Sequence, residues 1–528
     1  MEGRRDRRLH WFAATLGLLA LWLLLYLPYA GAPEWHHEEA RRAVPAREML
    51  TSGDWVEPTL FGQSYWNKPP LFMWSVAAAS RFTGGVDEWA VRWPCLLGSL
   101  LGACIALAFA GRYFGVMAGV WAGILYLVTW TVVDKGREGE IEGLFGPLVL
   151  GALSALWAAP RSLAAALLSG LFLGAALLAK GPPALLFLGA GYAALWYLSE
   201  RGLWRNWRVY VPAVVGILPL LLWTYLLMQR VEGGALWNRW GGELAREGDG
   251  GWSAYWRDRG TYGLGMLLGL FPTSWLLLGG LGEWRRDPAP RALQYALLAG
   301  LLALLLFALP VGTRARYGFP AYGLFAIAGG GLLARVRARN QRFRSPITWR
   351  PVAWLCALVG IAGGVLAAAA PWWDPLHVGD PTIPARLAGA LGLGAGTFAL
   401  YRSTSALRRD FLPAALLALV CGRTVYHLLV IRAQAADRPF ETMARVVENL
   451  RHEDQTIWTG LRGQYNAAAY LSPPPRWWQD GAAPVQPGDL LLLLPDAPLP
   501  AEQQFAWQKM VLPAEQMDRW AVYRRVGE

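Results

Sequence analysis

The chain has 528 residues, of which 55% are hydrophobic and 16% are charged, and its formal net charge is +12. A soluble protein of this size would carry about 25% charged residues, so the composition excludes an ordinary soluble enzyme. No basic cluster is interleaved with aromatic residues in the manner of a nucleic-acid site, so we expect no nucleic-acid partner and interpret the positive excess as a signal of membrane topology.

Apolar segments of roughly 20 residues recur along most of the chain, which is typical of a polytopic membrane protein with helical spans. We expect about thirteen spans from this pattern. They lie near residues 10–30, 91–111, 116–133, 142–159, 162–179, 182–199, 209–228, 262–282, 291–310, 317–336, 351–371, 384–402 and 411–431. The sequence therefore predicts an all-α polytopic membrane fold.

The first apolar segment follows the basic start MEGRRDRR and resembles a signal peptide, with an Ala-x-Ala pattern at Ala30 and Ala32. Because the segment is longer than a usual signal-peptide core, we expect an uncleaved first helix. With the amino terminus inside, the arginine clusters at 201–208, 285–286, 334–350 and 402–409 fall in cytoplasmic connections, as the positive-inside rule requires. In the same topology, the external segments are the opening loop, the connections at 134–142, 229–261 and 312–317, and the tail.

The tail after about Ala433 differs in kind from the rest of the chain. Its pattern indicates an amphipathic helix around Glu441–Leu450 and short strands at Thr456–Thr459, Leu490–Leu494 and Trp520–Val526. We therefore expect a membrane module over residues 1–433, with a first external loop at 31–90, and a small external α/β domain over 434–528.

The segment Pro33–Trp74 is unusually long and polar for a connection between membrane helices. It begins with the carboxylate pair Glu38 and Glu39, followed by Arg41 and Arg42. Ionisable groups gathered at a membrane boundary mark a candidate functional site. The alternative is a solvated loop with an amphipathic helix on the bilayer, in which the arginines pair with the carboxylates at i,i+3 or i,i+4.

A second pair of carboxylates, Glu140 and Glu142, lies in the segment Asp134–Gly143, close to a predicted membrane boundary. A carboxylate at the bilayer centre costs about 2.5–3.5 kcal/mol, so a buried one usually has a partner or a task. Two carboxylate clusters on one face suit a reaction that needs a base and a second polar anchor. In the alternative, both side chains are interfacial and point to water.

Basic residues gather on the same external face. They are Lys68, Lys135, Arg137, Lys180, Arg314 and Arg316. Arginine offers a fork of donors that fits phosphate oxygens, and lysine offers a point charge. Cations beside carboxylates therefore suggest a phosphorylated substrate whose other end is apolar. The alternative is attraction to anionic lipid at the membrane surface.

The histidine and cysteine spacings indicate no metal site. His36 and His37 are adjacent, so their side chains point apart on a helix. The four cysteines lie in apolar runs without metal-ligand spacing. A cation held by one of these histidines with Glu38 or Glu39 stays open. No phosphate-binding loop, dinucleotide fingerprint or nucleophile elbow appears.

The opening loop resembles the first external loop of bacterial GT-C glycosyltransferases, in particular the aminoarabinose-transferase-like group related to protein O-mannosyltransferases. The matching residues are Glu38-Glu39-Ala40-Arg41-Arg42-Ala43, Arg47-Glu48-Met49-Leu50, Ser52-Gly53-Asp54-Trp55, Pro58, Gly62, Tyr65, Lys68-Pro69-Pro70-Leu71 and Trp74. Three further patches agree: Leu178-Ala179-Lys180-Gly181-Pro182, Lys135-Gly136-Arg137 with Glu140 and Glu142, and Arg316-Tyr317 with Pro320. The resemblance is sharp to about Leu185, moderate to Leu324 and architectural beyond.

The resemblance implies a membrane transferase that moves a sugar from a polyprenyl phosphate or diphosphate to a lipid, glycan or protein outside the cytoplasmic membrane. It implies Glu38 as general base, Glu39 and Arg41 as neighbours that position it, and Glu140 or Glu142 as the second acidic position. The implied phosphate-binding residues are Lys68, Arg41, Lys180, Arg137 and Arg316, and the implied substrate-positioning residues are Tyr65, Asn67 and Tyr317. A single displacement would invert the anomeric centre and needs no separate general acid.

Two departures from the family pattern leave the aminoarabinose donor and the lipid A acceptor open. Asn67 stands where relatives often have glutamate before Lys-Pro, which weakens the expectation of a metal ligand, although a divalent cation stays open. Arg42-Ala43-Val44 stands where relatives often have Tyr-Ala-Glu. The alternatives are a transporter or flippase of lipid-linked intermediates, a non-catalytic scaffold, and a ligase that uses diphosphate-linked polymers. Charges on one external face, without inverted repeats, favour the enzyme.

Overall fold

The computed structural model describes the chain except for residues 1, 29, 33–36, 200–201, 232–250, 285–288, 310–313, 339–345, 372–380, 405–410, 432–438, 453–454, 460–468, 472–474, 478–485, 494–506, 511–520 and 527–528. The helices of its first half are α1 (Glu2–Tyr26), α2 (His37–Ser52), α3 (Leu71–Thr83), α4 (Glu88–Phe114), α5 (Val116–Val128), α6 (Trp130–Arg137), α7 (Ile141–Ala158), α8 (Leu163–Lys180), α9 (Pro183–Leu198) and α10 (Val211–Met228). The short 3-10 helix η1 (Ala159–Arg161) connects α7 to α8, and η2 (Leu203–Arg205) and η3 (Trp207–Val209) lie between α9 and α10.

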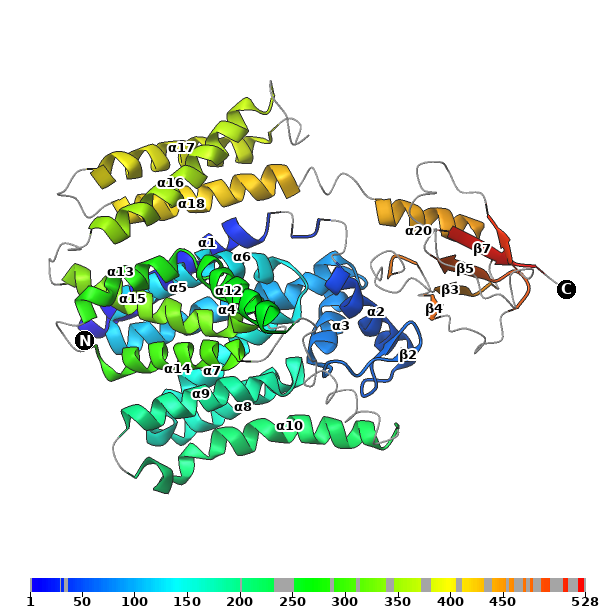
Figure 1. The fold of residues 1–528 in the computed structure, drawn as a ribbon, viewed down its shortest axis with the longest axis horizontal. Helices are drawn as coiled ribbons and strands as arrows, with labels where there is room; N and C mark the ends of the chain where they lie inside the picture. Colours follow the sequence, from blue (N-terminus) through cyan, green and yellow to red (C-terminus); the bar gives the residue numbers. More distant parts are fainter. Residues whose placement is uncertain are drawn as a thin grey trace.

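The second half continues the helical body. Its helices are α12 (Gly251–Gly269), α13 (Thr273–Trp284), α14 (Arg291–Ala308), the 3-10 helix η4 (Ala315–Ala321), α15 (Tyr322–Ala338), α16 (Pro346–Ala369), α17 (Ile383–Thr404), α18 (Phe411–Tyr426) with the π-helix η5 (His427–Ile431), and α20 (Pro439–Leu450). Figure 1 shows the long helices packed as one slab, with the carboxyl-terminal domain at one end and the amino terminus at the opposite end.

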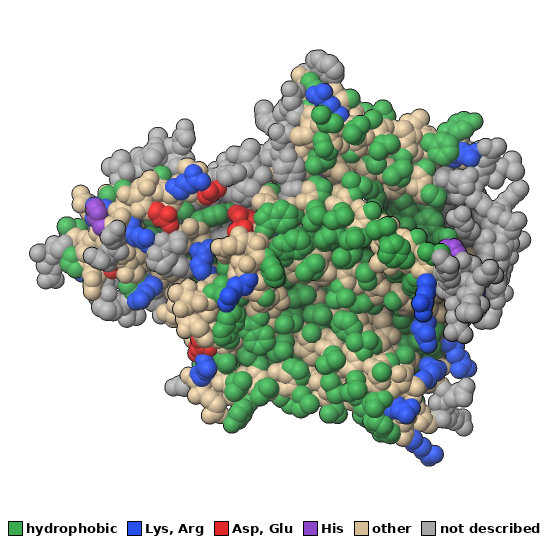
Figure 2. Space-filling view, turned by 180° about the vertical axis from the view of Figure 1, so that it is seen from behind, with side chains coloured by type: hydrophobic (Ala, Val, Ile, Leu, Met, Phe, Trp, Pro, Cys, Tyr) green, Lys and Arg blue, Asp and Glu red, His purple; other side chains and the backbone are tan. Residues whose placement is uncertain are grey.

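Each expected span coincides with helical structure, so the predicted polytopic fold is confirmed. Within the described residues, nine helices are long and apolar enough to cross a membrane, and the bent pair α5–α6 brings the number to ten. Two further apolar helices, at 183–198 and 353–369, are shorter. The number is lower than expected because these two are short and because the segment at 262–282 is broken. Figure 2 shows a broad hydrophobic face across the helical body, with charged side chains gathered at its two ends.

The span expected over 116–133 is helical but bent, because the chain turns by 64° between α5 and α6. Thr129 is extended at the bend, and its hydroxyl donates back to the carbonyl of Leu125 at 2.6 Å. The Trp130 amide leaves the helical pattern and donates to the carbonyl of Phe271 at 3.0 Å. Phe271 lies in the break between α12 and α13, where Pro272 has no amide hydrogen to continue a helix. This hydrogen bond therefore joins the bend between α5 and α6 to the break between α12 and α13, and gives a backbone group of each a partner.

Small residues let α4 and α7 approach closely just below the second pair of carboxylates. A Cβ on Gly98 would lie 2.5 Å from the carbonyl oxygen of Gly143. A Cβ on Gly143 would lie 2.7 Å from Cβ of Cys95 and would also collide with the carbonyl of Lys135. Close helix contact through small residues is typical of membrane helix packing. This contact fixes the start of α7, and with it the position of Glu142.

The opening loop is folded rather than extended. After α2, the strands β1 (Thr59–Leu60) and β2 (Gln63–Ser64) form a hairpin whose turn residues Phe61 and Gly62 have φ of 55° and 74°. Two positive φ values in a two-residue turn are those of the type I′ hairpin. The Glu48 carboxylate of α2 accepts hydrogen bonds from the Thr59 hydroxyl and, at 3.1 Å, from the Gly62 amide.

The carboxyl-terminal domain contains the expected helix, α20, and a five-stranded mixed sheet. The strands are β3 (Ile457–Thr459), β4 (Arg476–Trp477), β5 (Leu490–Leu493), β6 (Trp507–Lys509) and β7 (Ala521–Arg525), in the order β4-β3-β5-β7-β6. The three strands predicted from the sequence are present. The short strands β4 and β6 were not predicted, because two or three residues show no alternation.

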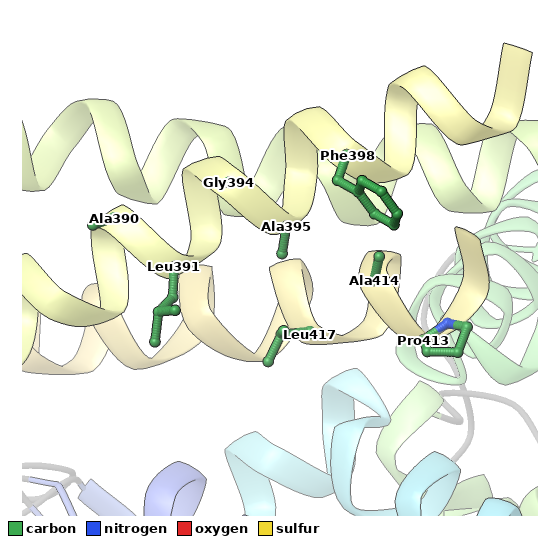
Figure 3. Close-up of a pocket in the computed structure, with 8 residues that line it drawn as sticks. All are labelled: Ala390, Leu391, Gly394, Ala395, Phe398, Pro413, Ala414 and Leu417. Atoms are coloured by element: carbon green, nitrogen blue, oxygen red, sulfur yellow. The ribbon is translucent and has the colours of Figure 1, made fainter. Parts of the chain in front are cut away.

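An apolar pocket lies between α17 and α18 (Figure 3). Its volume is about 520 Å³, and its lining carries no ionisable side chain. The lining residues are Ala390, Leu391, Gly394, Ala395, Phe398, Pro413, Ala414 and Leu417. Such a surface suits hydrocarbon and offers no group for chemistry.

Candidate active site

The first acidic residue, Glu38, lies in the first turn of α2 and is held by two arginines of the same helix. Arg41 Nη1 is 3.4 Å from Glu38 Oε1, and Arg42 Nη2 is 3.2 Å from Glu38 Oε2. Arg42 is buried and also donates to the Tyr65 hydroxyl at 2.9 Å. Burial lowers the pKa of the Arg42 guanidinium, but the Tyr65 oxygen and the Glu38 carboxylate outweigh burial and raise the pKa overall. The helical i,i+3 and i,i+4 pairing expected as the alternative is present.

Glu39 faces away from Glu38 and is fully buried. Its oxygens accept from Arg92 Nε at 2.7 Å and Nη2 at 2.9 Å, and from the Gly139 amide at 2.7 Å. Arg92 of α4 also donates to the carbonyls of Ala30 and Ala32, at 2.9 and 2.5 Å. Glu39 therefore joins α2 and α4 to the segment Asp134–Gly143, which we call the second acidic loop. The sequence interpretation missed Arg92, although an arginine inside an apolar span was itself a signal.

The second acidic loop brings two carboxylates and three cations together. Glu140 Oε1 accepts from Lys135 Nζ at 2.9 Å, and Glu142 Oε1 accepts from Lys180 Nζ at 3.0 Å. Arg316 of η4 lies between them, with Nη1 3.8 Å from Glu140 Oε2 and Nε 3.8 Å from Glu142 Oε1. At 3.8 Å the charges attract, but the atoms are too far apart for a hydrogen bond.

The second oxygen of Glu140 stands out in this cluster. Glu140 is only 3% exposed, and no donor in the part of the chain that the structure describes reaches its Oε2 within hydrogen-bond distance. The buried Arg316 Nε likewise has no hydrogen-bond partner among the described residues. A buried polar atom without a partner costs about 1–3 kcal/mol, and more when it is charged. Glu140 Oε2 can therefore accept a hydrogen bond, and Arg316 Nε can donate one, to a water or a bound molecule.

The Lys180 side chain is fixed by aromatic rings and by the end of its helix. Its Nζ lies 5.1 Å from the ring centroid of Tyr317 and 5.2 Å from that of Phe145, which are cation–π distances. Gly181, with a φ of 82°, ends α8, and a Cβ there would lie 3.6 Å from Pro69. The segment Asn67-Lys68-Pro69 of the opening loop, in which Asn67 and Lys68 are half-buried, is thereby brought against the end of α8.

Arg137, expected among the phosphate-binding residues, lies elsewhere. Its guanidinium donates to the carbonyls of Leu25 and Tyr26, at 2.8 and 2.9 Å, and to that of Pro28. These are orphan carbonyls at the carboxyl end of α1, which an arginine satisfies well. The structure therefore places Arg137 at the end of α1 rather than with Glu140 and Glu142.

No group of three or more histidine, cysteine, aspartate and glutamate side chains among the described residues is placed to hold a metal ion. The alternative of a cation held by His36 or His37 lies outside the described side chains.

The chain resembles proteins of known activity over most of its length. The model of the dolichyl-phosphate-mannose-protein mannosyltransferase family matches residues 67–225. The undecaprenyl phosphate-alpha-4-amino-4-deoxy-L-arabinose arabinosyl transferase of Edwardsiella ictaluri is 28% identical over 415 residues, covering 75% of this chain and 71% of that protein. ArnT from Cupriavidus metallidurans superposes over 97% of both chains at 18% identity, with TM-scores of 0.70 in its apo state and 0.72 bound to undecaprenyl phosphate.

These matches and the fold define the chain as a polytopic glycosyltransferase of the inner membrane with the GT-C fold. Within this class it resembles the ArnT-like transferases and the protein mannosyltransferases, so the resemblance stated from the motifs of the opening loop is confirmed.

Proposed function

We propose that the chain transfers a sugar from a polyprenyl-phosphate-linked donor to an acceptor on the outer face of the cytoplasmic membrane. The observation that carries this proposal is the convergence of Lys180, Arg316 and the Lys68 segment beside Glu140 and Glu142. Cations fit a phosphate, and carboxylates fit the hydroxyl groups of a sugar or acceptor. The ArnT structure bound to undecaprenyl phosphate supports a donor of this class.

The outer orientation is supported by the distribution of charge along the helices. The acidic cluster consists of Glu140, Glu142 and the basic residues that contact them. It lies where α6 ends, α7 begins and α8 ends. At the opposite ends of the helices, Arg112 lies in the last turn of α4 and Arg161 lies in η1 between α7 and α8. Arg205 and Arg208 lie in η2 and η3 between α9 and α10. Arginines in short loops mark the cytoplasmic side, so the acidic cluster and the carboxyl-terminal domain belong outside.

In the proposed reaction, Lys68 and Arg316 hold the donor phosphate and Glu38 accepts the proton of the acceptor hydroxyl or amine. The acceptor atom attacks the anomeric carbon, and the bond from that carbon to the phosphate oxygen breaks. The electron pair leaves with the polyprenyl phosphate, whose charge the cations stabilise. A single displacement of this kind inverts the anomeric centre.

We assign the second acidic position to Glu140 and a supporting role to Glu142. Glu142 holds Lys180 at 3.0 Å, so its task is to fix that cation. Glu140 holds Lys135 with one oxygen, but its other oxygen is buried without a hydrogen-bond donor among the described residues, which suits a hydroxyl group of the sugar or acceptor. The register between these two residues stayed open in the sequence because both match the family position.

We further propose that the cations of the chain, rather than a divalent metal ion, stabilise the leaving phosphate. Turnover in excess EDTA is expected to equal turnover without it. Loss of activity in EDTA, restored by added Mg²⁺, would contradict this proposal.

The substrates are identified by comparing envelope lipids, glycans and glycoproteins of a deletion strain with its parent by mass spectrometry. A sugar that disappears on deletion and returns on complementation names donor and acceptor together. The purified protein in lipid nanodiscs is then expected to form the same product from the polyprenyl-phosphate donor. Movement of the donor across vesicles without any product would instead identify a flippase.

A further inference from the structure

The carboxyl-terminal domain contacts the helix that carries Glu38. Arg47 of α2 extends its guanidinium to the segment at residues 469–471, where Nη1 donates to the carbonyls of Ala469 at 3.0 Å and Leu471 at 3.1 Å. Nη2 lies 3.4 Å from the carbonyl of Val86, just before α4. One side chain therefore joins the domain to both α2 and the entrance of α4.

The same segment makes a second contact through Tyr470. Its hydroxyl donates to Glu88 Oε1 at 2.7 Å, in the first turn of α4. The Tyr470 side chain packs against both the main core and the core of the carboxyl-terminal domain, while its neighbours Ala469 and Leu471 are fully buried. The 469–471 segment is thus a packed junction between the two cores.

The geometry of α2 and α4 connects this junction to the acidic residues. Arg47 follows Glu38 by nine residues, which at 3.6 residues per turn places it on the opposite face of α2. Glu88 precedes Arg92 by one turn of α4, and Arg92 holds Glu39. The 469–471 segment therefore contacts α2 on the face opposite Glu38. Through Glu88 it also contacts α4, whose Arg92 holds the turn of α2 that contains Glu38 and Glu39. Figure 1 shows α20 and the sheet at this end of the slab, next to α2 and α3.

We propose that the carboxyl-terminal domain positions the active site, with Arg47 and Tyr470 as positioning residues that set where α2 presents Glu38. This proposal rests on the transferase function proposed above and adds a role for the domain. A displacement of about 1 Å at a catalytic group can cost about a hundredfold in rate. Small shifts of α2 are therefore sufficient to change turnover, while the donor phosphate still meets Lys68 and Arg316.

The test compares Arg47→Ala and Tyr470→Phe with wild type, using the full chain in nanodiscs. Turnover is expected to fall by about tenfold or more in Arg47→Ala and less in Tyr470→Phe, with KM for the donor changed by less than about twofold. Amide hydrogen exchange of α2 is expected to become faster in both variants. Arg47→Lys keeps the charge but lacks the fork that reaches two carbonyls, so it should recover only part of the turnover.

Arg445→Ala is the matched control, because Arg445 lies on the exposed face of α20 and pairs with Glu441 of the same helix. It is expected to match wild type in turnover and in exchange of α2. Unchanged exchange of α2 in Arg47→Ala and Tyr470→Phe, or unchanged turnover in both, would overturn the proposal. If the Arg47→Ala protein does not insert into the membrane, Tyr470→Phe tests the proposal alone. This substitution removes only one oxygen atom and is therefore the milder change. If wild type forms no product, the proposed function fails, while hydrogen exchange still decides whether the domain holds α2.

Discussion

At the scale of single residues, the carboxylates of the site all have basic partners, but one of them keeps an oxygen without a hydrogen-bond donor among the described residues. Glu39 and Glu142 have their charges neutralised by Arg92 and Lys180. Glu140 keeps Oε2 buried and without a hydrogen-bond donor among the described residues. A buried oxygen left without a donor is available to a polar group of a ligand.

Replacing Glu140 by glutamine is expected to reduce turnover by about tenfold or more, because a neutral amide accepts a weaker hydrogen bond from a substrate hydroxyl than a carboxylate does. Turnover of the purified variant in nanodiscs measures this effect. Glu57→Gln serves as control, since Glu57 lies in the exposed opening loop and accepts a hydrogen bond from Ser64. Turnover of Glu140→Gln close to that of the control would refute the assignment.

Replacing Glu39 by glutamine is expected to act on stability. The change leaves the Arg92 guanidinium buried without its counter-charge, and removing one partner of a buried pair costs about 3–5 kcal/mol. Thermal unfolding of the purified variant should therefore begin well below that of wild type. A Glu39→Gln protein as stable as wild type but inactive would instead make Glu39 a catalytic group.

At the scale of elements, the spans were predictable because each is long and apolar, and the amphipathic pattern of α20 was equally clear. The bend between α5 and α6 was not predictable, because it depends on a hydrogen bond from Trp130 to Phe271, far along the chain. The grouping of Glu38, Glu140, Lys180 and Arg316 on one face followed from topology. Their individual partners did not, since pairings such as Lys180 with Glu142 depend on how the helices pack.

Replacing Gly143 by alanine is expected to separate α4 from α7. The added methyl group would meet Cβ of Cys95 at 2.7 Å and the backbone of Lys135, and overpacking of this kind costs about 1–3 kcal/mol. Thermal unfolding and turnover should both decrease. Gly189→Ala in α9 is the matched control, because no neighbouring atom of the described residues lies within 4 Å of a Cβ there. Equal effects of the two substitutions would exclude close packing as the cause.

At the scale of the whole molecule, one polar end of the helical slab holds the acidic cluster and the carboxyl-terminal domain. The domain contacts α2 through Arg47 and α4 through Tyr470, so it belongs to the same structural unit as the site. The sequence distinguished this domain by its pattern of one amphipathic helix and short strands. It could not show the contact, because the bonds to Ala469 and Leu471 involve backbone carbonyls, which no side-chain pattern reveals.

The orientation of the molecule is testable by thiol labelling in intact cells. A cysteine at Arg445 on α20 should react with a membrane-impermeant reagent, while a cysteine at Arg205 should react only after lysis. The native chain is a suitable background, because Cys95, Cys356 and Cys421 are buried and Cys104 is partly buried. The reverse labelling pattern would place the acidic cluster on the cytoplasmic side.

The central claim is that Glu38 acts as the base in sugar transfer from a polyprenyl-phosphate donor. The most direct measurement is turnover of wild type and Glu38→Gln, with the anomeric configuration of the product determined by NMR. We predict an inverted product and a loss of turnover of about a hundredfold or more in Glu38→Gln, after equal folding and insertion are confirmed. Wild-type turnover by Glu38→Gln, or a product with retained configuration, would contradict this mechanism.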